Sequence, residues 1–507
     1  MITGRWFLIA VFCTVSSLVS AQKIIYSDPE KDDTRRMNFD IVGKIGGNFL
    51  VYKNIRNSNS IVLFNDEMQQ VAKVEQDYLP DYDRMINVDF FAYSNFFYMI
   101  YQYQKHNIVY CTGVKIDANG KRISDVIEMD TTRIGFAANN KIYTVLSSED
   151  KSKIIVFKIN NRNRKLYAMT TMLYNDKLEL LKKSRLAIQM EDRDDYLNEF
   201  YLDNDGDLVF SKFLRSNGDY ITDASFVIKP AMGDTLMVNN LKIDKTNLDE
   251  IHIKVDNFNK RYLLTSFYYR QHGGSIDGFY FYIWDKRTSR LYKQDTIVFN
   301  EDLRKEARGE NSLKMAFDDY FIRNIIIKKD GGFLIGSECY YTTSRYNNWN
   351  RWDYLYGSPF NSPWGYYYYS PYYSNLWMNS RYNSSPNVRY HADNIAVLSF
   401  DSTAKLQWSN VIGKGQYDDE TDDEISYQLM NTGGQLHFLF NEIERRANLL
   451  NDYTISPDGQ LNHNPTLKNL DRGYEFMPKY GKQVSAKQII IPCIHRNLIC
   501  FAKIDYD

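Results

Sequence analysis

The sequence predicts an all-β protein built from repeated units of four antiparallel strands. Apolar strands recur along the chain, and a turn rich in Asn, Gly or Asp precedes nearly every one. These turn residues tolerate the positive φ angles that tight hairpins require. The apolar strand that follows each turn is the second of its unit, and it begins near Phe49, Phe97, Ile142, Leu208, Tyr262, Phe333, Leu436 and Ile489.

The third strand of several units ends in a second polar turn. Residues 114–121 read VKIDANGK, and an altered form of this pattern, LSFDSTAK, stands at 398–405. Shorter versions stand at 283–286 and 455–460. A further apolar stretch follows each turn, for example at 406–412, and it supplies a fourth strand.

A single four-stranded sheet leaves both of its faces open to water. Sheets stacked around a common axis bury both faces, which is the arrangement of a β-propeller. Eight second strands predict eight blades, with seven as the alternative if residues 176–244 are not a full unit. The last unit ends after its third strand, so we expect residues 23–26 to supply the outer strand and close the ring. A solenoid or a pair of β-sandwiches is the alternative architecture.

The stretch from Asp401 to Trp408 resembles the strand endings of quinoprotein-type (PQQ-like) and WD40-like propellers, in which a packed aromatic side chain follows an Asp turn. The chain as a whole resembles uncharacterised secreted β-propeller proteins of Gram-negative bacteria. These resemblances imply the propeller architecture, and they imply no cofactor.

The N-terminus has the layout of a secretory signal peptide. Arg5 precedes an apolar stretch that ends at Val19, and Ala21 closes a cleavage site of small residues. A transmembrane anchor is the alternative, but it needs about 20 apolar residues and this stretch is shorter. We expect residues 1–21 to be removed and 22–507 to form one propeller domain without a transmembrane segment. The mature protein is expected in the periplasm or at the outer membrane, with the extracellular medium as an alternative.

The charges of the chain nearly cancel. There are 62 basic and 63 acidic side chains, and the formal net charge is −1. Nucleic-acid-binding proteins carry a strong positive field, which this composition lacks. We therefore expect no nucleic-acid partner.

Two cysteines near the C-terminus are candidates for a disulfide. Once Cys13 is removed with the signal peptide, the four remaining cysteines allow three pairings. If residues 489–504 form a hairpin, Cys493 lies directly opposite Cys500, within disulfide reach. Two buried, unbonded thiols are the alternative.

Candidate catalytic and metal-binding residues are few. Asp203, Asp205 and Asp207 could converge on a calcium ion, but they occupy a turn of the repeat, which favours an ordinary hairpin turn. Residues 418–424 carry six carboxylates and are interpreted as a solvated loop. The seven histidines are dispersed, and there is no G-x-S-x-G nucleophile motif. The sequence names no catalytic residue, no resident metal and no cofactor, and it is more typical of a binding protein than of an enzyme.

The segment 340–390 is the most unusual part of the chain. It is rich in Trp and Tyr, and its length indicates an insertion between two strands of the sixth unit. Aromatic rings in polar loops form protein interfaces and stack on sugars. The alternative is that the rings fold down on the propeller's own surface or form a low-complexity loop. The candidate binding residues are Trp349, Trp352, Trp364, Tyr366, Tyr367, Tyr368, Tyr369, Tyr372, Tyr373 and Trp377.

Two hypotheses of function follow from these observations. The leading one is a non-enzymatic secreted propeller that binds a protein or a glycan of the cell envelope. The alternative is a polysaccharide hydrolase or lyase of propeller fold, in which carboxylates near the axis carry the chemistry.

Overall fold

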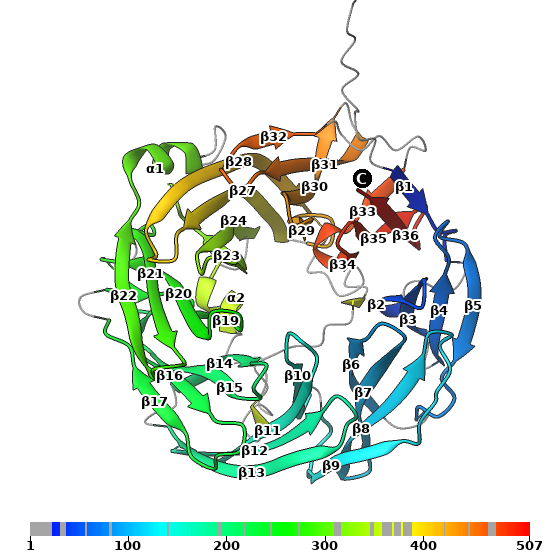
Figure 1. The fold of residues 1–507 in the computed structure, drawn as a ribbon. Helices are drawn as coiled ribbons and strands as arrows, with labels where there is room; N and C mark the ends of the chain where they lie inside the picture. The colour runs from blue at the N-terminus through cyan, green and yellow to red at the C-terminus, as the bar shows by residue number, and fades with distance from the viewer. Residues whose placement is uncertain are drawn as a thin grey trace, which may run out of the picture.

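The chain is seen here in a computed structural model, in which hydrogen bonds join the strands into seven antiparallel sheets within the described residues. Figure 1 shows these sheets standing side by side around a common axis, so the predicted β-propeller fold is confirmed. The predicted signal peptide lies outside the described residues. The structure describes residues 23–506 except for 31–36, 56–57, 81–83, 139–140, 164, 191–194, 217, 244–245, 272–273, 309–315, 345–348, 357–367, 370–376, 379–387, 420, 445–446 and 465–472.

The first three sheets along the chain each begin with the strand nearest the axis and continue outward (Figure 1). The first holds β2 (Met37–Ile45), β3 (Asn48–Ile55), β4 (Ser58–Phe64) and β5 (Gln70–Glu75). The second holds β6 (Arg84–Ala92), β7 (Phe96–Lys105), β8 (Ile108–Asp117) and β9 (Ile127–Arg133). The third holds β10 (Tyr143–Ser147), β11 (Lys153–Asn163), β12 (Leu166–Asn175) and β13 (Leu180–Gln189).

One second strand was placed wrongly by the sequence reasoning. The strand expected near Ile142 is β10, the innermost strand of its sheet, and the second strand is β11. Both are apolar and follow polar turns, because the innermost strand of this sheet is also packed between neighbouring sheets. Apolar pattern alone therefore does not tell the two positions apart.

The next sheet has nine strands and contains two ladders of four. They are β14 (Asp195–Leu202), β15 (Leu208–Arg215), β16 (Ile221–Lys229) and β17 (Met237–Asn240), then β19 (His252–Asp256), β20 (Arg261–Tyr269), β21 (Gly278–Asp285) and β22 (Arg290–Val298). The two-residue strand β18 (Asn247–Leu248) pairs with both β16 and β20. This short bridge joins the two ladders into one hydrogen-bonded sheet.

The last three sheets complete the arrangement. They hold β23 (Tyr320–Ile327), β24 (Phe333–Ser344), β27 (Val388–Phe400) and β28 (Leu406–Asp418); then β29 (Tyr427–Asn431), β30 (Leu436–Glu444), β31 (Ala447–Ile455) and β32 (Leu461–His463); and finally β33 (Tyr474–Phe476), β34 (Lys482–Ser485), β35 (Gln488–His495), β36 (Leu498–Asp505) and β1 (Lys23–Tyr26). The N-terminal strand β1 pairs antiparallel with β36, with Lys23 opposite Asp505.

Helical structure is sparse in the described residues. Helix α1 (Glu301–Ala307) begins at Asn300, whose side chain accepts a hydrogen bond from the Leu303 amide. Helix α2 (Arg351–Tyr356) and the 3₁₀ turn η3 (Pro478–Tyr480) are shorter. None of the described helices has the length and apolar character to cross a membrane.

The hydrophobic core lies between neighbouring sheets. Phe97 of β7 and Tyr52 of β3, for example, belong to one buried cluster that draws on two sheets. The first and last sheets share a cluster in the same way, and the rings of Phe39 and Phe501 are 5.2 Å apart. Each sheet thus buries both faces against its neighbours, which is the reason why units of this size fold together.

Polar turns after the third strands are closed by side chains. Asp117 Oδ1 accepts hydrogen bonds from the amides of Asn119 and Lys121, at 2.9 and 2.8 Å. Asp401 makes the equivalent pair of bonds to the amides two and four residues further on. These bonds explain why the sequence repeats an Asp or Asn at this point of the unit.

The turn at residues 456–459 also receives a side chain from the preceding sheet. Trp408 Nε1 donates a hydrogen bond to the carbonyl of Pro457 at 3.2 Å. Gly459 has a φ of +91°, and a Cβ atom at this position would lie 2.7 Å from the Trp408 ring. The glycine is therefore required both by its backbone and by the close approach of the tryptophan.

We predict that Gly459→Ala destabilises the protein more than Gly433→Ala. Gly433 has a similar φ of +87°, but no atom lies within 4 Å of the point that a Cβ atom would occupy there. Both changes cost about 1–2 kcal/mol of backbone energy, and the contact with Trp408 adds about 1–3 kcal/mol at Gly459. Urea unfolding of the two variants measures the difference, and equal losses would contradict it.

Candidate functional site

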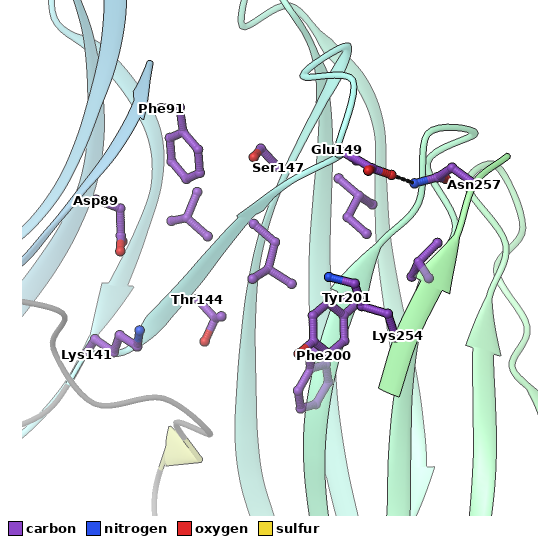
Figure 2. Close-up of a pocket in the computed structure, with 14 residues that line it drawn as sticks. Asp89, Phe91, Lys141, Thr144, Ser147, Glu149, Phe200, Tyr201, Lys254 and Asn257 are labelled. Carbon is purple, nitrogen blue, oxygen red and sulfur yellow. Dashed lines mark hydrogen bonds between the residues drawn. The ribbon is translucent and has the colours of Figure 1, made fainter. Parts of the chain in front are cut away.

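A cavity of about 510 Å³ lies among the axis-facing strands of four neighbouring units. Strands β6, β10, β14 and β19 contribute to its wall, as Figure 2 shows. Its volume is in the range of small-molecule sites, which is about 300–1,000 Å³. The lining is partly apolar and partly charged, with Phe91, Val145, Leu146, Phe200, Leu202 and Val255 beside Asp89, Lys141, Glu149, Tyr201 and Lys254.

Asp89 and Lys141 stand on one side of this cavity (Figure 2). Asn87 Nδ2 donates to Asp89 Oδ2 at 2.8 Å. Burial raises the pKa of Asp89 to about 6, although the positive charge of Lys141 and the bond from Asn87 oppose the rise and the negative charge of Asp40 adds to it. Burial also lowers the pKa of Lys141, and the charge of Asp89 opposes that change. The pair thus holds a carboxyl group that titrates near neutral pH.

Lys254 and Tyr201 stand on the other side of the cavity (Figure 2). Burial raises the pKa of the Tyr201 hydroxyl, and the nearby Glu199 carboxylate raises it further. At the rim, Asn257 Nδ2 donates to Glu149 Oε2 at 2.7 Å. Glu149 is therefore already engaged by a neutral donor.

Next to the cavity, His252 of β19 lies between two carboxylates. Its Nδ1 is 3.4 Å from Glu199 Oε1, and its Nε2 is 3.0 Å from Glu250 Oε2. Burial alone would lower the pKa of His252, but the two carboxylates raise it to about 10. The imidazole is thus held as a cation at neutral pH, and its charge is balanced by its neighbours.

The aromatic insertion leaves its own sheet between β24 and β27, as the sequence predicts. Its helix α2 then packs on another part of the propeller. Trp352 is only 2% exposed and contacts the rings of Tyr196 and Phe213 on β14 and β15. Arg351 Nε donates to Asp249 Oδ2 at 2.6 Å. This first part of the insertion therefore folds down onto the protein's own surface.

Two further points of the insertion are also attached to distant sheets. Strand β25 (Tyr368–Tyr369) pairs with β11, and strand β26 (Trp377–Met378) pairs with β2. Trp349 is half-buried and donates from Nε1 to Asp319 Oδ1 at 3.0 Å. The predicted binding residues Trp364, Tyr366, Tyr367, Tyr372 and Tyr373 lie outside the described residues.

Asp203, Asp205 and Asp207 do converge, but on a lysine. Lys286 Nζ lies 2.7 Å from Asp205 Oδ2 and 2.8 Å from Asp207 Oδ2, and it also pairs with Asp203. Asp203 Oδ1 accepts bonds from the amides of residues 205 and 207 as well. The ammonium group of the next ladder therefore takes the place that the calcium interpretation gives to an ion. Within the described residues, no group of three or more His, Cys, Asp or Glu side chains could hold a metal ion.

The acidic run at 418–424 is not simply solvated. Asp423 is 1% exposed and accepts a hydrogen bond from the Tyr480 hydroxyl at 3.0 Å. Asp422 pairs with Lys479 at 2.6 Å, and Asp419 pairs with Arg389 at 2.6 Å. The interpretation as a solvated loop was wrong, because neighbouring segments supply cations and hydroxyl groups that the run alone does not reveal.

Cys493 and Cys500 lie directly opposite each other on β35 and β36, in the register that the sequence predicts. Their Sγ atoms are 2.8 Å apart, and both residues are free thiols in this structure. The disulfide itself stays a prediction. Cys111 and Cys339 are also buried free thiols.

The residues of the axial cavity were missed by the sequence reasoning. No spacing motif links Asp89, Lys141 and Lys254, which come from separate units. The sequence pattern that could have revealed these residues is a charged side chain on or beside the first strand of a unit. Asp89, for example, interrupts an otherwise apolar stretch. Such charges are unusual in buried strands unless they are paired or functional.

Comparison with models of protein families finds no match, and comparison with curated protein sequences finds none either. Among solved structures, the chain is similar to prolyl oligopeptidase B from Galerina marginata, with a TM-score of 0.40 and 8% identity over 91% of this chain and 56% of that one. It is also similar to an ulvan lyase from a new polysaccharide lyase family, with a TM-score of 0.36 and 10% identity over 82% of this chain and 94% of that one.

A third similar structure is the β-propeller domain of the trilobed protease from Pyrococcus furiosus, with a TM-score of 0.36 and 12% identity over 84% of this chain and 94% of that one. The chain spans only 56% of the length of the prolyl oligopeptidase. At this level of similarity the comparisons assign neither a family nor an activity.

We predict that Asp89 makes the stability of the protein fall as the pH rises from 4 to 6. Its pKa is raised from 3.8 to about 6, so in this range the folded protein holds a proton that the unfolded chain has lost. Asp89→Asn should remove about 1–3 kcal/mol of this pH dependence. Urea unfolding at pH 4, 5, 6 and 6.5 measures it.

The control for this experiment is Asp125→Asn, which changes an exposed carboxylate in the segment between β8 and β9. It should leave the pH profile of the wild type unchanged. If Asp89→Asn and the wild type lose stability in parallel across this range, the raised pKa of Asp89 is wrong.

Proposed function

We infer that the chain is an exported, non-enzymatic β-propeller of eight blades that binds a protein or glycan partner in the cell envelope. Removal of residues 1–21 would place residues 22–507 in the periplasm or at the outer membrane. Export outside the cell is the alternative location. The proposal extends the resemblance to secreted propellers of Gram-negative bacteria.

The number of four-stranded ladders and of buried clusters between them supports the eight-bladed ring. The nine-stranded sheet consists of two four-stranded ladders, and among the described strands β18 is the one that joins them. Counting each ladder as a blade gives eight units, and a buried cluster lies between each pair of neighbours. Pairing of β1 with β36 would close the ring without a free edge.

The observation that carries the binding proposal is the anchoring of the insertion. A segment that leaves one sheet is attached through α2, β25 and β26 to strands of three other units. Figure 1 shows α2 lying toward the axis rather than at the outer edge. Anchoring at several points lowers the entropy cost of presenting the intervening aromatic residues to a partner. Tyr and Trp in such segments supply large contact areas with few rotatable bonds.

The test must spare the part of the insertion that belongs to the core. Removal of the whole of 342–388 would take away Trp352 and leave the buried Asp249 without Arg351, so loss of folding would be the result. Replacing Tyr366, Tyr367, Tyr372 and Tyr373 by Ser avoids this problem.

We predict that the four-Tyr variant folds but loses its partner. Tagged wild-type protein and the variant are used to capture proteins and glycans from the native envelope, and mass spectrometry identifies what is retained. The control replaces Phe258 and Tyr292 by Ser, since both are exposed on other parts of the propeller. Equal recovery of partners by all three proteins would overturn the proposal.

The alternative function, a polysaccharide hydrolase or lyase, is favoured by one observation. Asp89 is a carboxyl group in an open cavity whose pKa is raised to about 6, which suits a general acid at neutral pH. Glycoside hydrolysis needs a second carboxyl group about 5–10 Å away. Glu149 also lines the cavity, at its rim.

Under the leading proposal we predict no turnover of acidic or neutral polysaccharides by the wild type. Reducing ends and unsaturated products are measured after incubation with a panel of polysaccharides. Product formation that Asp89→Asn abolishes, at unchanged thermal stability, would establish the alternative instead.

A further inference from the structure

The axial cavity offers apolar surface to a ligand. Phe91 of β6, Leu146 of β10 and Val255 of β19 are partly exposed and line it. Phe200 and Leu202 are 0% and 4% exposed, so they lie behind this surface and support it. An aromatic or aliphatic body placed here would displace water from Phe91, Leu146 and Val255, which is favourable at about 25 cal/mol per Å².

Two ammonium groups point into the same cavity from opposite sides. Figure 2 shows the side chain of Lys141 beside Thr144 and that of Lys254 above Tyr201, each with its nitrogen directed inward. Lys141 lies next to Asp89, and each affects the other's pKa. The positive charge of Lys141 is therefore balanced when Asp89 is ionised.

Lys254 differs from Lys141 because no anion balances it among the described residues. It is half-buried and lines the cavity, yet neither an ion pair nor a hydrogen bond engages its ammonium group there. Two carboxylates on or beside the neighbouring strands, Glu199 and Glu250, are paired with His252. Glu149 is bonded to Asn257. A ligand anion in the cavity would form an ion pair with this ammonium group.

We propose that the axial cavity binds a small organic anion, with its carboxylate, sulfate or phosphate group at Lys254 and its apolar body against Phe91, Leu146 and Val255. Lys141, across the cavity, is balanced by Asp89, so Lys254 is the cation left for a ligand. A cationic ligand would be repelled by Lys254, and a neutral one would leave it unpaired. The cavity therefore selects for negative charge as well as for an apolar body.

This binding site is independent of the proposed role of the aromatic insertion. Its lining residues lie on β6, β10, β14 and β19 or beside these strands, and none belongs to 340–390. If the four-Tyr variant keeps its partner, the cavity proposal is unaffected. If the cavity does not bind an anion, the partner proposal is likewise unaffected.

The experiment uses a matched pair of fluorescent probes, one charged and one neutral. 8-Anilinonaphthalene-1-sulfonate carries an aromatic body and a sulfonate, and N-phenyl-1-naphthylamine carries the same body without the charge. The full mature chain is titrated with each probe. We expect the sulfonate to bind more tightly, and Lys254→Met to weaken it about fivefold to tenfold while changing the neutral probe less than twofold.

The control variant is Lys73→Met, which removes the same charge from the exposed outer strand β5. It should bind both probes like the wild type. Thermal unfolding of both variants checks that they remain folded. Equal binding of the sulfonate by wild type and Lys254→Met, equal loss in both variants, or no binding by the wild type would each overturn the proposal.

Competition then distinguishes the source of the anion. Octanoate presents a carboxylate on an alkyl chain, and glucuronate presents one on a sugar ring. Displacement of the bound sulfonate by octanoate supports a lipid-like body, and displacement by glucuronate supports an acidic sugar. If neither displaces the probe at millimolar concentration, the proposed recognition of carboxylates is wrong.

Discussion

Burial of both faces of every sheet is the constraint on which this structure depends. The middle strands of each unit are apolar on both sides, so no unit is shielded from water until it has a neighbour on each side. Contacts between Phe39 of the first sheet and Phe501 of the last meet this requirement at the two chain ends. The requirement applies to every pair of neighbouring sheets, and it therefore links the stability of distant units.

The parts of the fold that could be predicted from sequence are those determined by local chemistry. Turn residues such as Asp117 and Asp401 close the repeat with hydrogen bonds to amides two and four residues away. The register of Cys493 opposite Cys500 follows from the tight turn between two consecutive apolar strands. The position of the insertion, between β24 and β27, follows from the excess length of one unit.

The parts that could not be predicted depend on residues distant in sequence. Lys286 meets three aspartates of the preceding ladder, and nothing near Asp203 in the sequence reveals it. Trp352 looks like an interface residue because its segment is polar and aromatic, yet it is buried against Tyr196 and Phe213. Burial of that kind depends on where the insertion crosses the propeller, and a local pattern carries no information about that path.

Charged side chains inside the propeller show a similar division. Glu338 and Lys414 are completely buried, 2.9 Å apart, and a Ser426 hydroxyl also donates to Glu338. In such a pair each buried charge is neutralised by the other. The loss of either residue would leave an uncompensated buried charge. Around the cavity the same kind of charge is only partly compensated, because Lys254 faces an open space instead of a carboxylate. A charge that is already paired, such as Lys414, stabilises the fold. A charge that faces a cavity without a partner, such as Lys254, is the kind that our proposal assigns to binding.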